Sequence, residues 1–417
     1  MTTQYDRWIA RFWVFWMSQT VARIGSAFSG FALVWWVAKT YGTATSLATG
    51  TLITMLPSIV LGPLIGTLVD RLHRKTVILC ANIVYAVAAL ALFSLSEAGM
   101  LTLWHLYVVM FVNALAGQFH YLSVSAATTL LVPAEQLQRI GGISQLREGA
   151  VSVLAPPVGA LLIEAIGLNG VLFIEIVTAM MAFALVLSIR IPDPPAAAEE
   201  SSHEGVFASL RSGFAYVLGW PGLLALMAMA MVVNLFFNPA FSLMPLLVKD
   251  HFQGGVIQLA WMETGFGAGM IAGSLLLGVW GGFTRKLYTL LLGVAIMGLA
   301  AFCLGVLPSS GILTAIAAMV IIGIAQPLTN APLMAIIQGT VPLELQGRVM
   351  GFLGSAAGII SPIGLLLAGP VSDRLGVQVW YLVAGVVALI AVTVGLLLPV
   401  LRTLDDARAA HTDEATP

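Results

Sequence analysis

The sequence alternates between long apolar runs and short polar connections, and this alternation is the strongest constraint on its fold. The runs reach about 20 residues or more, the length that a helix needs to cross the hydrocarbon core of a bilayer. Hydrophobic residues make up 59% of the 417-residue chain and charged residues 9%, whereas a soluble domain has roughly 45–50% and about 25%. Backbone polar groups inside a membrane need local partners, so each run is predicted to be a helix. The chain is therefore predicted to be an all-α membrane protein.

Charged and turn residues divide the apolar sequence into twelve predicted transmembrane helices. They are placed at residues 12–38, 44–69, 76–96, 103–131, 147–167, 170–190, 221–248, 256–283, 287–307, 312–340, 349–370 and 377–401. The polar segment 191–219 is rich in Pro, Ala, Ser and Glu, which is typical of a linker. We therefore predict an N-terminal six-helix half at 1–190, a cytoplasmic linker at 191–219, a C-terminal six-helix half at 220–402 and a disordered cytoplasmic tail at 403–417.

Lysine and arginine residues predict the orientation of these helices, because short cytoplasmic loops carry an excess of both. If both termini are cytoplasmic, only Lys39, Lys249 and Arg374 lie outside, and Arg23 lies within a span. All the others lie inside: Arg7, Arg11, Arg71, Arg74, Lys75, Arg139, Arg147, Arg190, Arg211, Arg285, Lys286, Arg348, Arg402 and Arg408. We predict a multi-pass protein of the plasma (inner) membrane with both termini in the cytoplasm. The first apolar run is too long for the core of a cleaved signal peptide, so it is expected to be retained.

The two predicted halves repeat each other. Three segments of the first half recur in the second in the same order. Gly62…Arg74-Lys75 matches Gly273…Arg285-Lys286 at an offset of 211 residues, and Val132-Pro133…Arg139 matches Val341-Pro342…Arg348 at an offset of 209. Pro157-Val-Gly159 matches Pro362-Ile-Gly364 at an offset of 205. Such a repeat indicates an internal duplication. Duplicated halves made of helices are typical of secondary transporters, which bind substrate between the halves.

The connection between the second and third runs concentrates charge at the membrane surface. Gly62 and Gly66 are four residues apart, and we expect them to let their helix approach a neighbour closely. Four ionised residues follow within six positions and cannot lie in hydrocarbon: Asp70, Arg71, Arg74 and Lys75. They are predicted to form a tight cytoplasmic loop.

This loop, from Gly66 to Lys75, resembles the signature between the second and third helices of the major facilitator superfamily, with His73 where the family usually has glycine. The resemblance covers both halves and implies twelve helices in two pseudo-symmetric halves that alternate access to a substrate. It implies that five residues form a gate on the cytoplasmic side: Gly66, Asp70, Arg71, Arg74 and Lys75. In the second copy Gly281 and Gly282 replace Asp70 and Arg71, so the gate is expected to be asymmetric.

Within this superfamily the sequence resembles the branch of drug:proton antiporters that includes macrolide and enterobactin exporters. The resemblance rests on Ser18-Gln19-Thr20, Arg23-Ile-Gly25-Ser26, Trp35-Trp36, Val132-Pro133, and Gly347-Arg348-Val349. The fifth-helix antiporter signature Gly-Pro-x-x-Gly-Gly here reads Ala155-Pro156-Pro157-Val158-Gly159-Ala160, with alanine at two of its glycines. The resemblance implies proton-coupled export.

Ionisable residues at membrane depth are costly and are therefore candidates for function. Arg23 lies about 18 Å along the helix axis from Arg11, and the family branch commonly carries an acid near the position of Glu175. Glu263 lies about 12 Å beyond Gly255 along its helix. We predict that Glu175 and Glu263 bind and release the coupled proton and that Arg23 is their electrostatic partner. The structural alternative for Arg23 is a fixed ion pair between helices, and for Glu175 it is a salt bridge to Arg23 or a helix-packing hydrogen bond. No basic residue in its own helix can neutralise Glu263.

Uncharged polar residues recur on single helix faces and are candidates for lining a substrate cavity. They are Gln19 and Ser26, Asn113 and His120, Asn234 and Asn238, and Gln326 and Asn330. Together with nearby aromatic residues, they suit a bulky amphipathic molecule. For any single residue in this set, a role in helix packing is the alternative.

Several function classes are disfavoured by the motifs. There is no phosphate-binding loop, zinc-ligand spacing or nucleophile elbow, so we expect no enzyme activity, cofactor or metal. Basic residues are scattered singly, which disfavours nucleic-acid binding, and Cys80 and Cys303 are interpreted as small apolar packing residues.

The sequence predicts a monomeric secondary transporter that exports amphipathic drug-, macrolide- or siderophore-like molecules and uses a proton (or sodium) gradient. The alternative is an importer or facilitator of a small hydrophilic solute.

Overall fold

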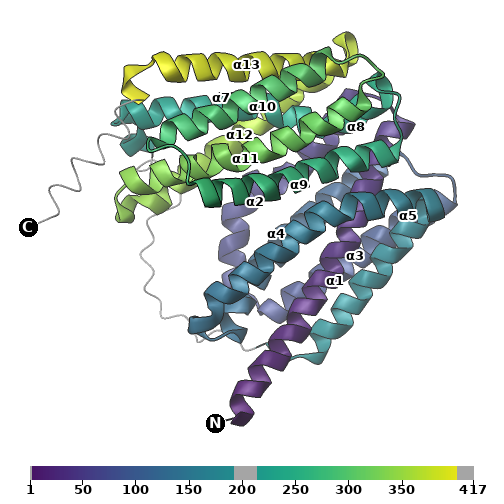
Figure 1. Cartoon of the computed structure of the whole chain (residues 1–417). Coiled ribbons are helices and arrows are strands. Elements are labelled where there is room, and N and C mark those ends of the chain that lie inside the picture. The colour runs from purple at the N-terminus through teal and green to yellow at the C-terminus, as the bar shows by residue number, and fades with distance from the viewer. Residues whose placement is uncertain (1, 192–213, 402–417) are drawn as a thin grey trace, which may run out of the picture. The chain divides into compact units, whose positions relative to one another are not determined.

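The computed structural model describes residues 2–191 and 214–401, and every regular element within these ranges is helical (Figure 1). The predicted tail and most of the predicted linker lie outside the described residues. The chain forms two compact units, Met1–Gly42 with Gly50–Ser201 and Thr43–Thr49 with Ser202–Pro417. The all-α fold class predicted from the sequence is confirmed.

The first unit contains five long helices, the second of which has its first residues, up to Thr49, assigned to the other unit. These are α1 (Thr2–Thr40), α2 (Ala44–Arg71), α3 (Arg74–Glu97), α4 (Leu103–Leu131) and α5 (Leu137–Ser188), with the short 3₁₀ helix η1 (Ala134–Gln136) before α5. A helix of 52 residues would be about 78 Å long, more than twice the thickness of a membrane core. Gly167 interrupts α5 with φ 67° and ψ −177°, a conformation open mainly to glycine. The element therefore consists of two arms, residues 137–166 and 168–188.

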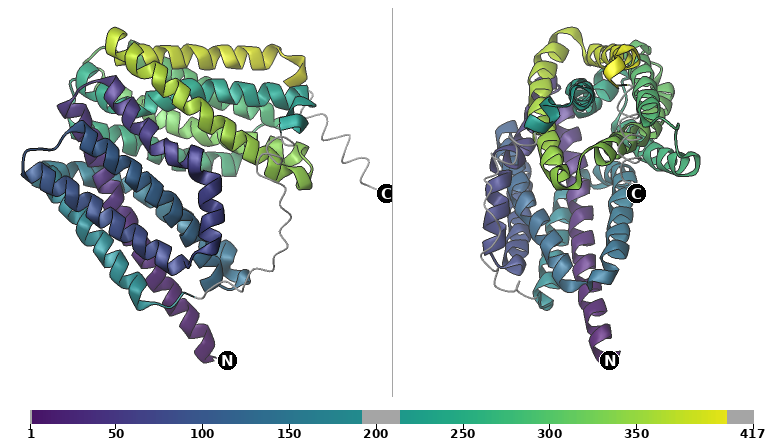
Figure 2. Two further views of the ribbon diagram at one scale, coloured as in Figure 1. Left: turned by 180° about the vertical axis from the view of Figure 1, so that it is seen from behind. Right: turned by 90° about the vertical axis from the view of Figure 1, so that its left-hand side faces the viewer.

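The second unit contains six long helices. These are α7 (Pro221–Ser242), α9 (Val256–Trp280), α10 (Lys286–Val306), α11 (Ile312–Thr340), α12 (Leu343–Leu375) and α13 (Val377–Leu397). The short helix α8 (Met244–Leu246) and the π-helical turn η2 (Leu247–His251) follow α7. The chain turns directly from α12 into α13 at Gly376, whose φ is 88° (Figure 2).

Eleven helices in the described residues are long and apolar enough to cross a membrane. Because one of them is the two-armed α5, this number agrees with the twelve predicted spans. Several boundaries differ from the prediction, among them those of the fifth and seventh spans. The fifth span is predicted at 147–167, whereas its helix begins at Leu137. The seventh is predicted to continue to residue 248, whereas α7 ends at Ser242, three residues after Pro239, which cannot donate a helix hydrogen bond.

Close helix contacts occur at glycines, but not where the sequence suggested them. A Cβ atom at Gly62 would meet nothing within 4 Å, so the predicted close approach of α2 at this residue is wrong. Its counterpart Gly273 does pack tightly, because a Cβ there would overlap the carbonyl oxygen of Ile324 in α11. The packing role inferred for Cys80 and Cys303 is also wrong, because both side chains are exposed on their helices.

An apolar cluster joins the ends of four helices in the first unit. Its buried members come from α1, α3, α4, α5 and the segments that adjoin α4 and α5: Phe12, Phe15, Ile78, Ala127, Leu131, Val132, Ile140, Val186, Ile189 and Ile191. By the predicted orientation this cluster lies at the cytoplasmic end of the unit. The positions of the polar residues along these helices are described below relative to this cluster.

Candidate functional site

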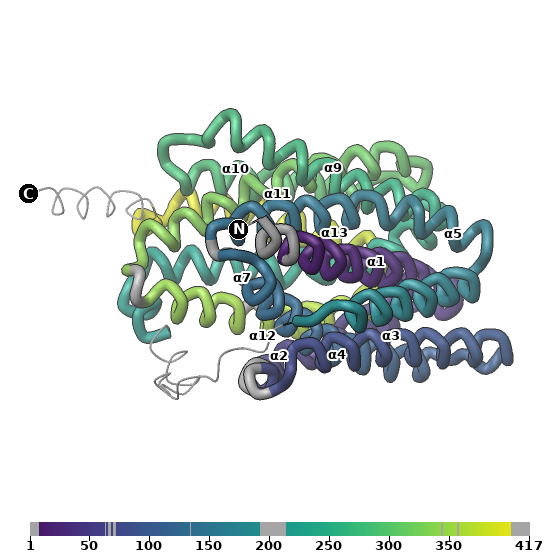
Figure 3. Tube along the Cα trace, turned by 90° about the horizontal axis from the view of Figure 1, so that it is seen from below, coloured from purple at the N-terminus to yellow at the C-terminus, as the bar shows by residue number. Residues whose placement is uncertain are grey.

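Helix α1 packs against both arms of α5 and presents a different face to each (Figure 3). Toward the first arm it offers Arg23 and Phe31, and Phe31 packs on Gly159. Toward the second arm it offers Gly25, where a Cβ would overlap the hydroxyl of Thr178. Residues 23 and 25 differ by about 200° around a helix, which explains the two opposite faces.

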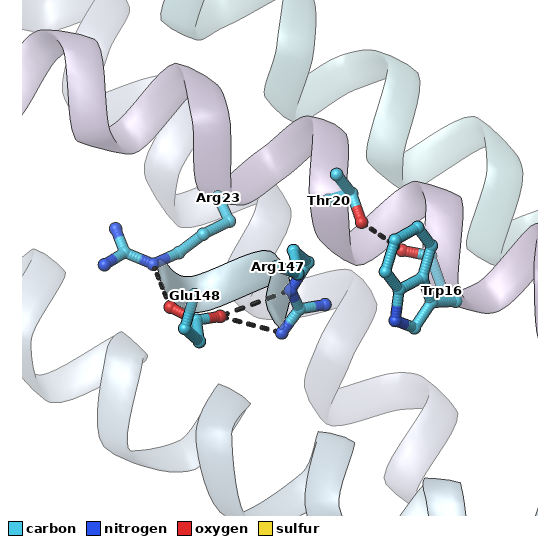
Figure 4. Close-up of polar contacts among 5 residues, drawn as sticks. All are labelled: Trp16, Thr20, Arg23, Arg147 and Glu148. Atoms are coloured by element: carbon cyan, nitrogen blue, oxygen red, sulfur yellow. Dashed lines mark hydrogen bonds and ion pairs between the residues drawn. The ribbon is translucent and has the colours of Figure 1, made fainter. Parts of the chain in front are cut away.

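The first face carries an ion pair between α1 and the first arm of α5. The Nε atom of Arg23 donates to Glu148 Oε2 at 3.1 Å, and the terminal nitrogens of Arg23 point away from this carboxylate (Figure 4). The other carboxylate oxygen of Glu148 accepts hydrogen bonds from Nε and Nη2 of Arg147, at 3.2 and 2.8 Å. One carboxylate therefore bridges two guanidinium groups.

Arg147 is also held in place by an aromatic ring. Its guanidinium carbon lies 5.7 Å from the ring centroid of Trp16, a cation–π arrangement. Trp16 precedes Arg23 by two helical turns and shares its face of α1, and the Thr20 hydroxyl bonds to the Trp16 carbonyl at 2.8 Å (Figure 4). Adjacent residues on a helix do not normally face the same way, but Arg147 and Glu148 both turn toward α1.

This charge cluster, Arg23, Arg147 and Glu148, carries one net positive charge within predicted spans. The exposed fractions of the Arg23 and Glu148 side chains are 49% and 39%, against 15% for Arg147. Half-exposed charges are too costly to face hydrocarbon. The exposed surface of the cluster therefore faces water or other polar groups, as expected of a surface that meets a solute.

Arg23 is predicted from the sequence to pair with Glu175 or Glu263, and the structure corrects this assignment. Its ion-pair partner is Glu148, on the first arm of α5. Glu175 lies on the second arm, behind the opposite face of α1, and is 4% exposed. There its carboxyl accepts a hydrogen bond from the buried Ser29 hydroxyl and interacts electrostatically with Tyr85 of α3. Both structural alternatives considered from the sequence are therefore found: Arg23 forms an ion pair between helices, and Glu175 accepts a hydrogen bond in the packing of α1 against α5.

Glu263 lies two turns into α9, in the second unit. It is partly buried and has no ion-pair or hydrogen-bond partner among the residues that the structure describes. Two turns further along α9, a Cβ at Gly269 would overlap the Val320 carbonyl of α11.

The predicted gate residues are only partly described. Lys75, at the start of α3, donates to the carbonyls of Leu187 and Ile189 at 2.9 and 2.6 Å, and so caps the end of the second arm of α5. Arg74 donates to the Leu72 carbonyl at 3.4 Å. The surroundings of Gly66 and the side chains of Asp70 and Arg71 lie outside what the structure describes. Lys286, the counterpart of Lys75 in the second half, donates to the Ala335 carbonyl of α11 at 3.3 Å. The two lysines therefore have different partners.

The cavity candidates of the first unit are more buried than a solute-lining set would be. Gln19 is 5% exposed and donates to the Ser18 hydroxyl at 3.0 Å. Ser26 is partly buried, and its carbonyl faces the Ser29 hydroxyl at 3.5 Å. Asn113 and His120 lie on α4, where the His120 ring is edge-on to Tyr85 with centroids 6.0 Å apart. These residues lie between helices of one unit.

The cavity candidates of the second unit are more accessible. Asn234 and Asn238 are exposed on α7. The Asn238 amide donates to Ser361 of α12 at 2.9 Å and to Asn234 at 3.4 Å. On α11, Asn330 is exposed and Gln326 is partly buried. This unit therefore presents uncharged amides, whereas the first unit presents the charge cluster.

Sequence reasoning missed Glu148, Arg147 and Tyr85. The first two fall at the edge of a predicted span that starts ten residues too late, and Tyr85 lies in an apolar run without a charged neighbour. A useful signal was available for Glu148, since Arg23 requires an anion at similar depth and Glu148 lies about 16 Å along α5 from Leu137. No group of three or more candidate metal ligands is found among the described residues.

Comparison with known proteins identifies related sequences. The family model described as Major Facilitator Superfamily matches residues 15–251 and 226–417. Macrolide efflux protein A of Streptococcus pyogenes is 30% identical over 402 residues, covering 96% of this chain and 99% of that protein. Its namesake from Enterococcus faecalis is 31% identical over 314 residues, covering 75% and 97%. Multidrug efflux pump Tap of Mycobacterium bovis is 26% identical, covering 94% of each.

Solved structures of low sequence identity share the fold. A mutant of nucleoside transporter NupG matches with a TM-score of 0.71 at 12% identity, covering 92% of this chain and 99% of that one. A bacterial homologue of the human lysosomal transporter Spinster matches with a TM-score of 0.68 at 14% identity, covering 97% and 98%.

Proposed function

The chain belongs to the Major Facilitator Superfamily, and on that premise we propose that it exports amphipathic small molecules in exchange for protons, by alternating access. Membership makes it a multi-pass membrane transporter and not an enzyme. Its full-length relatives are macrolide and multidrug efflux proteins, which supports efflux as the direction of transport. We propose a location in the inner membrane, with both termini cytoplasmic, and a monomer as the working unit.

The observation that carries the proposal is the charge cluster of α1 and α5. The half-exposed Arg23–Glu148 pair of the first unit offers a polar anchor within the span for an otherwise apolar molecule. Taken by itself, the second unit exposes uncharged amides on α7 and α11 that can hydrogen-bond to a solute. Because the two guanidiniums share one carboxylate, protonation of Glu148 would release both cations toward solute or water. Glu148 therefore joins Glu175 and Glu263 as a candidate for proton coupling.

The test uses everted membrane vesicles from cells that lack their own drug exporters. An imposed pH gradient, acid inside the vesicles, should drive uptake of a fluorescent drug or a labelled macrolide, and a protonophore should abolish it. Glu175→Gln and Glu263→Gln should each remove the dependence on the gradient, because glutamine keeps the shape but cannot bind the proton. Glu164→Gln is the matched control, since Glu164 is an exposed carboxylate at the outer part of the same arm as Glu148.

Two outcomes would contradict the proposal. Full gradient dependence in both glutamine variants would exclude Glu175 and Glu263 as coupling residues. Uptake of a small hydrophilic solute into intact cells, with no drug movement in everted vesicles, would instead support the importer. Replacing sodium by potassium on both sides distinguishes the coupling ion, because a proton-coupled pump should keep its rate.

A further inference from the structure

Helices α3 and α4 are antiparallel neighbours whose register is fixed at two levels. Ile78 of α3 and Ala127 of α4 are members of the same apolar cluster. Farther along, the ring of Tyr85 lies edge-on to His120, with centroids 6.0 Å apart. Asn82 lies one turn from Ile78 in the direction of Tyr85, and Ser123 lies one turn from Ala127 in the direction of His120. Asn82 and Ser123 are therefore at the same level of the α3–α4 contact.

Polar atoms along this contact are buried and have no partners. Asn82 and Ser123 are both 0% exposed. Both polar side-chain atoms of Asn82, Oγ of Ser123, Nε2 of His120 and Oδ1 of Asn113 make no hydrogen bond with any residue that the structure describes. Leaving such groups unpaired in the interior is unfavourable, because they lose their hydrogen bonds to water and gain none in return. Several of them on two facing helices indicate a ligand that satisfies them together.

Gly117 makes room for the tyrosine hydroxyl in the same row. A Cβ atom at Gly117 would lie 3.3 Å from Tyr85 Oη, so the hydroxyl lies against the backbone of α4. Asn113 and His120 flank Gly117 at one turn on either side of the helix face. The Tyr85 hydroxyl therefore lies between the levels of Asn113 Oδ1 and His120 Nε2.

The chemistry of the row selects its ligand. Asn82 offers both a donor and an acceptor, Ser123 and Tyr85 carry hydroxyls that do both, and Asn113 Oδ1 is an acceptor. A cation would need acceptors only. A molecule that donates and accepts is needed, and buried water, which makes about three hydrogen bonds to such groups, fits this requirement.

We propose that the α3–α4 seam, formed by Asn82, Tyr85, Asn113, His120 and Ser123, binds a row of internal water molecules. The apolar cluster closes the seam beyond Asn82 and Ser123. Charged residues of neighbouring helices lie within electrostatic range of two of its members: Glu175 and Arg23 interact with Tyr85, and Arg147 interacts with His120.

The seam also suggests a route for the transported proton, and this part rests on the proposed function. A water hydrogen-bonded to the Tyr85 hydroxyl can pass a proton toward the Glu175 carboxylate, with one O–H bond broken for each one formed. Release follows the same path in reverse. Tyr85 is then a positioning residue that orders this water, and Glu175 holds the proton.

Hydroxyl-radical labelling by a brief X-ray pulse tests the water directly, because bound water activated beside a buried side chain modifies that side chain. We expect Tyr85 and His120 of the full chain in lipid nanodiscs to be labelled. In Asn82→Leu/Ser123→Ala, their labelling should decrease by about threefold or more, as the water loses its partners. Tyr41, 37% exposed in the turn between α1 and α2, should be labelled equally in both proteins, and Tyr381, 3% exposed and bonded to the Ala240 carbonyl, in neither.

Unchanged labelling of Tyr85 and His120 in the double variant would overturn the proposal. Ser123→Ala alone provides the same comparison with less risk to folding. Loss of labelling when sodium is added to a potassium buffer would point to a bound cation and would also overturn it.

The proton route has a separate readout. Tyr85→Phe should keep drug binding but slow gradient-driven transport, and its solvent isotope effect in D₂O should differ from that of the wild type. If transport is proton-driven and this variant matches the wild type, the route is wrong although the proposed function stands. If neither the wild type nor any variant responds to the gradient, the proposed function fails, whereas the labelling result is unaffected.

Discussion

At the scale of single residues, the chain places one carboxylate between two guanidiniums. Arg23 and Arg147 come from different helices, and Glu148 bonds to both. Burying a charge without its counter-ion is strongly unfavourable, although the partial exposure of these groups reduces the cost. The cluster is therefore stable only while Glu148 is ionised or while something else satisfies the two cations, which is a suitable property for a site that alternates between solute and proton.

We expect Glu148→Gln to lower stability by about 1–3 kcal/mol, because two cations lose their counter-ion. Transport should decrease by about tenfold or more. Thermal unfolding in detergent and drug uptake in everted vesicles measure the two effects. The double variant Arg23→Gln/Glu148→Gln removes one surplus cation, so it should regain stability without regaining transport. If Glu148→Gln retained both wild-type stability and wild-type transport, the cluster would have no role in either.

At the scale of elements, the beginning of α2 depends on a residue far away in the sequence. The segment Thr43–Thr49, which contains the start of α2, belongs to the second unit. In that unit the carboxylate of Asp373, in the last turn of α12, accepts hydrogen bonds from the backbone amides of Ala44 and Thr45 at 2.5 and 3.2 Å. It also accepts a hydrogen bond from the Thr45 hydroxyl at 2.5 Å. An anion is unfavourable at the C-terminus of its own helix and favourable at the N-terminus of another. Asp373 therefore stabilises the N-terminus of α2 and not its own helix, α12.

Asp373→Ala should consequently destabilise the protein by about 1–2 kcal/mol, the usual cost of removing a helix cap. Asp373→Asn should cost less, because its amide oxygen still accepts from one backbone amide. Asp250→Ala is the control, since Asp250 pairs with the adjacent Lys249 on an exposed turn, and such pairs contribute little. Melting temperatures of the three variants give the comparison, and equal values for Asp373→Ala and Asp250→Ala would argue against the cap.

Glycines set a second element-scale property, the approach of α9 to α11. A Cβ at Gly269 would overlap the Val320 carbonyl and lie 3.0 Å from Gly323 Cα, whereas one at Gly278 would meet nothing within 4 Å. Gly269→Ala should therefore force the helices apart and cost about 1–3 kcal/mol. Gly278→Ala, on the same helix, should be neutral or stabilising by up to about 1 kcal/mol. Thermal unfolding measures both, and an equal change in stability for both variants would argue against the close contact between α9 and α11.

At the scale of the whole molecule, the features that could be predicted from sequence are those encoded locally. Hydropathy indicated the helices, because a helix satisfies its own backbone inside a membrane, and the repeat indicated two sets of six. The partner of Arg23 could not be predicted, because Glu148 is 125 residues away and hydropathy carries no information on helix rotation. The same limit applies to Asp373 and the start of α2, and to Gly62, whose spacing resembles a packing motif but faces open space.

The orientation of the whole chain is the last prediction, and it follows from the distribution of positive charge. Lys39 and Lys249 should lie outside, and Arg139 and Arg285 inside, because basic residues are retained on the cytoplasmic side. In a background with Cys80 and Cys303 replaced by serine, single cysteines at these four positions can be treated with a membrane-impermeant maleimide. Lys39→Cys and Lys249→Cys should react in intact cells, whereas Arg139→Cys and Arg285→Cys should react only in everted vesicles. The reverse pattern would place both termini outside, and a mixed pattern would require an even number of spans between two successive labelled positions.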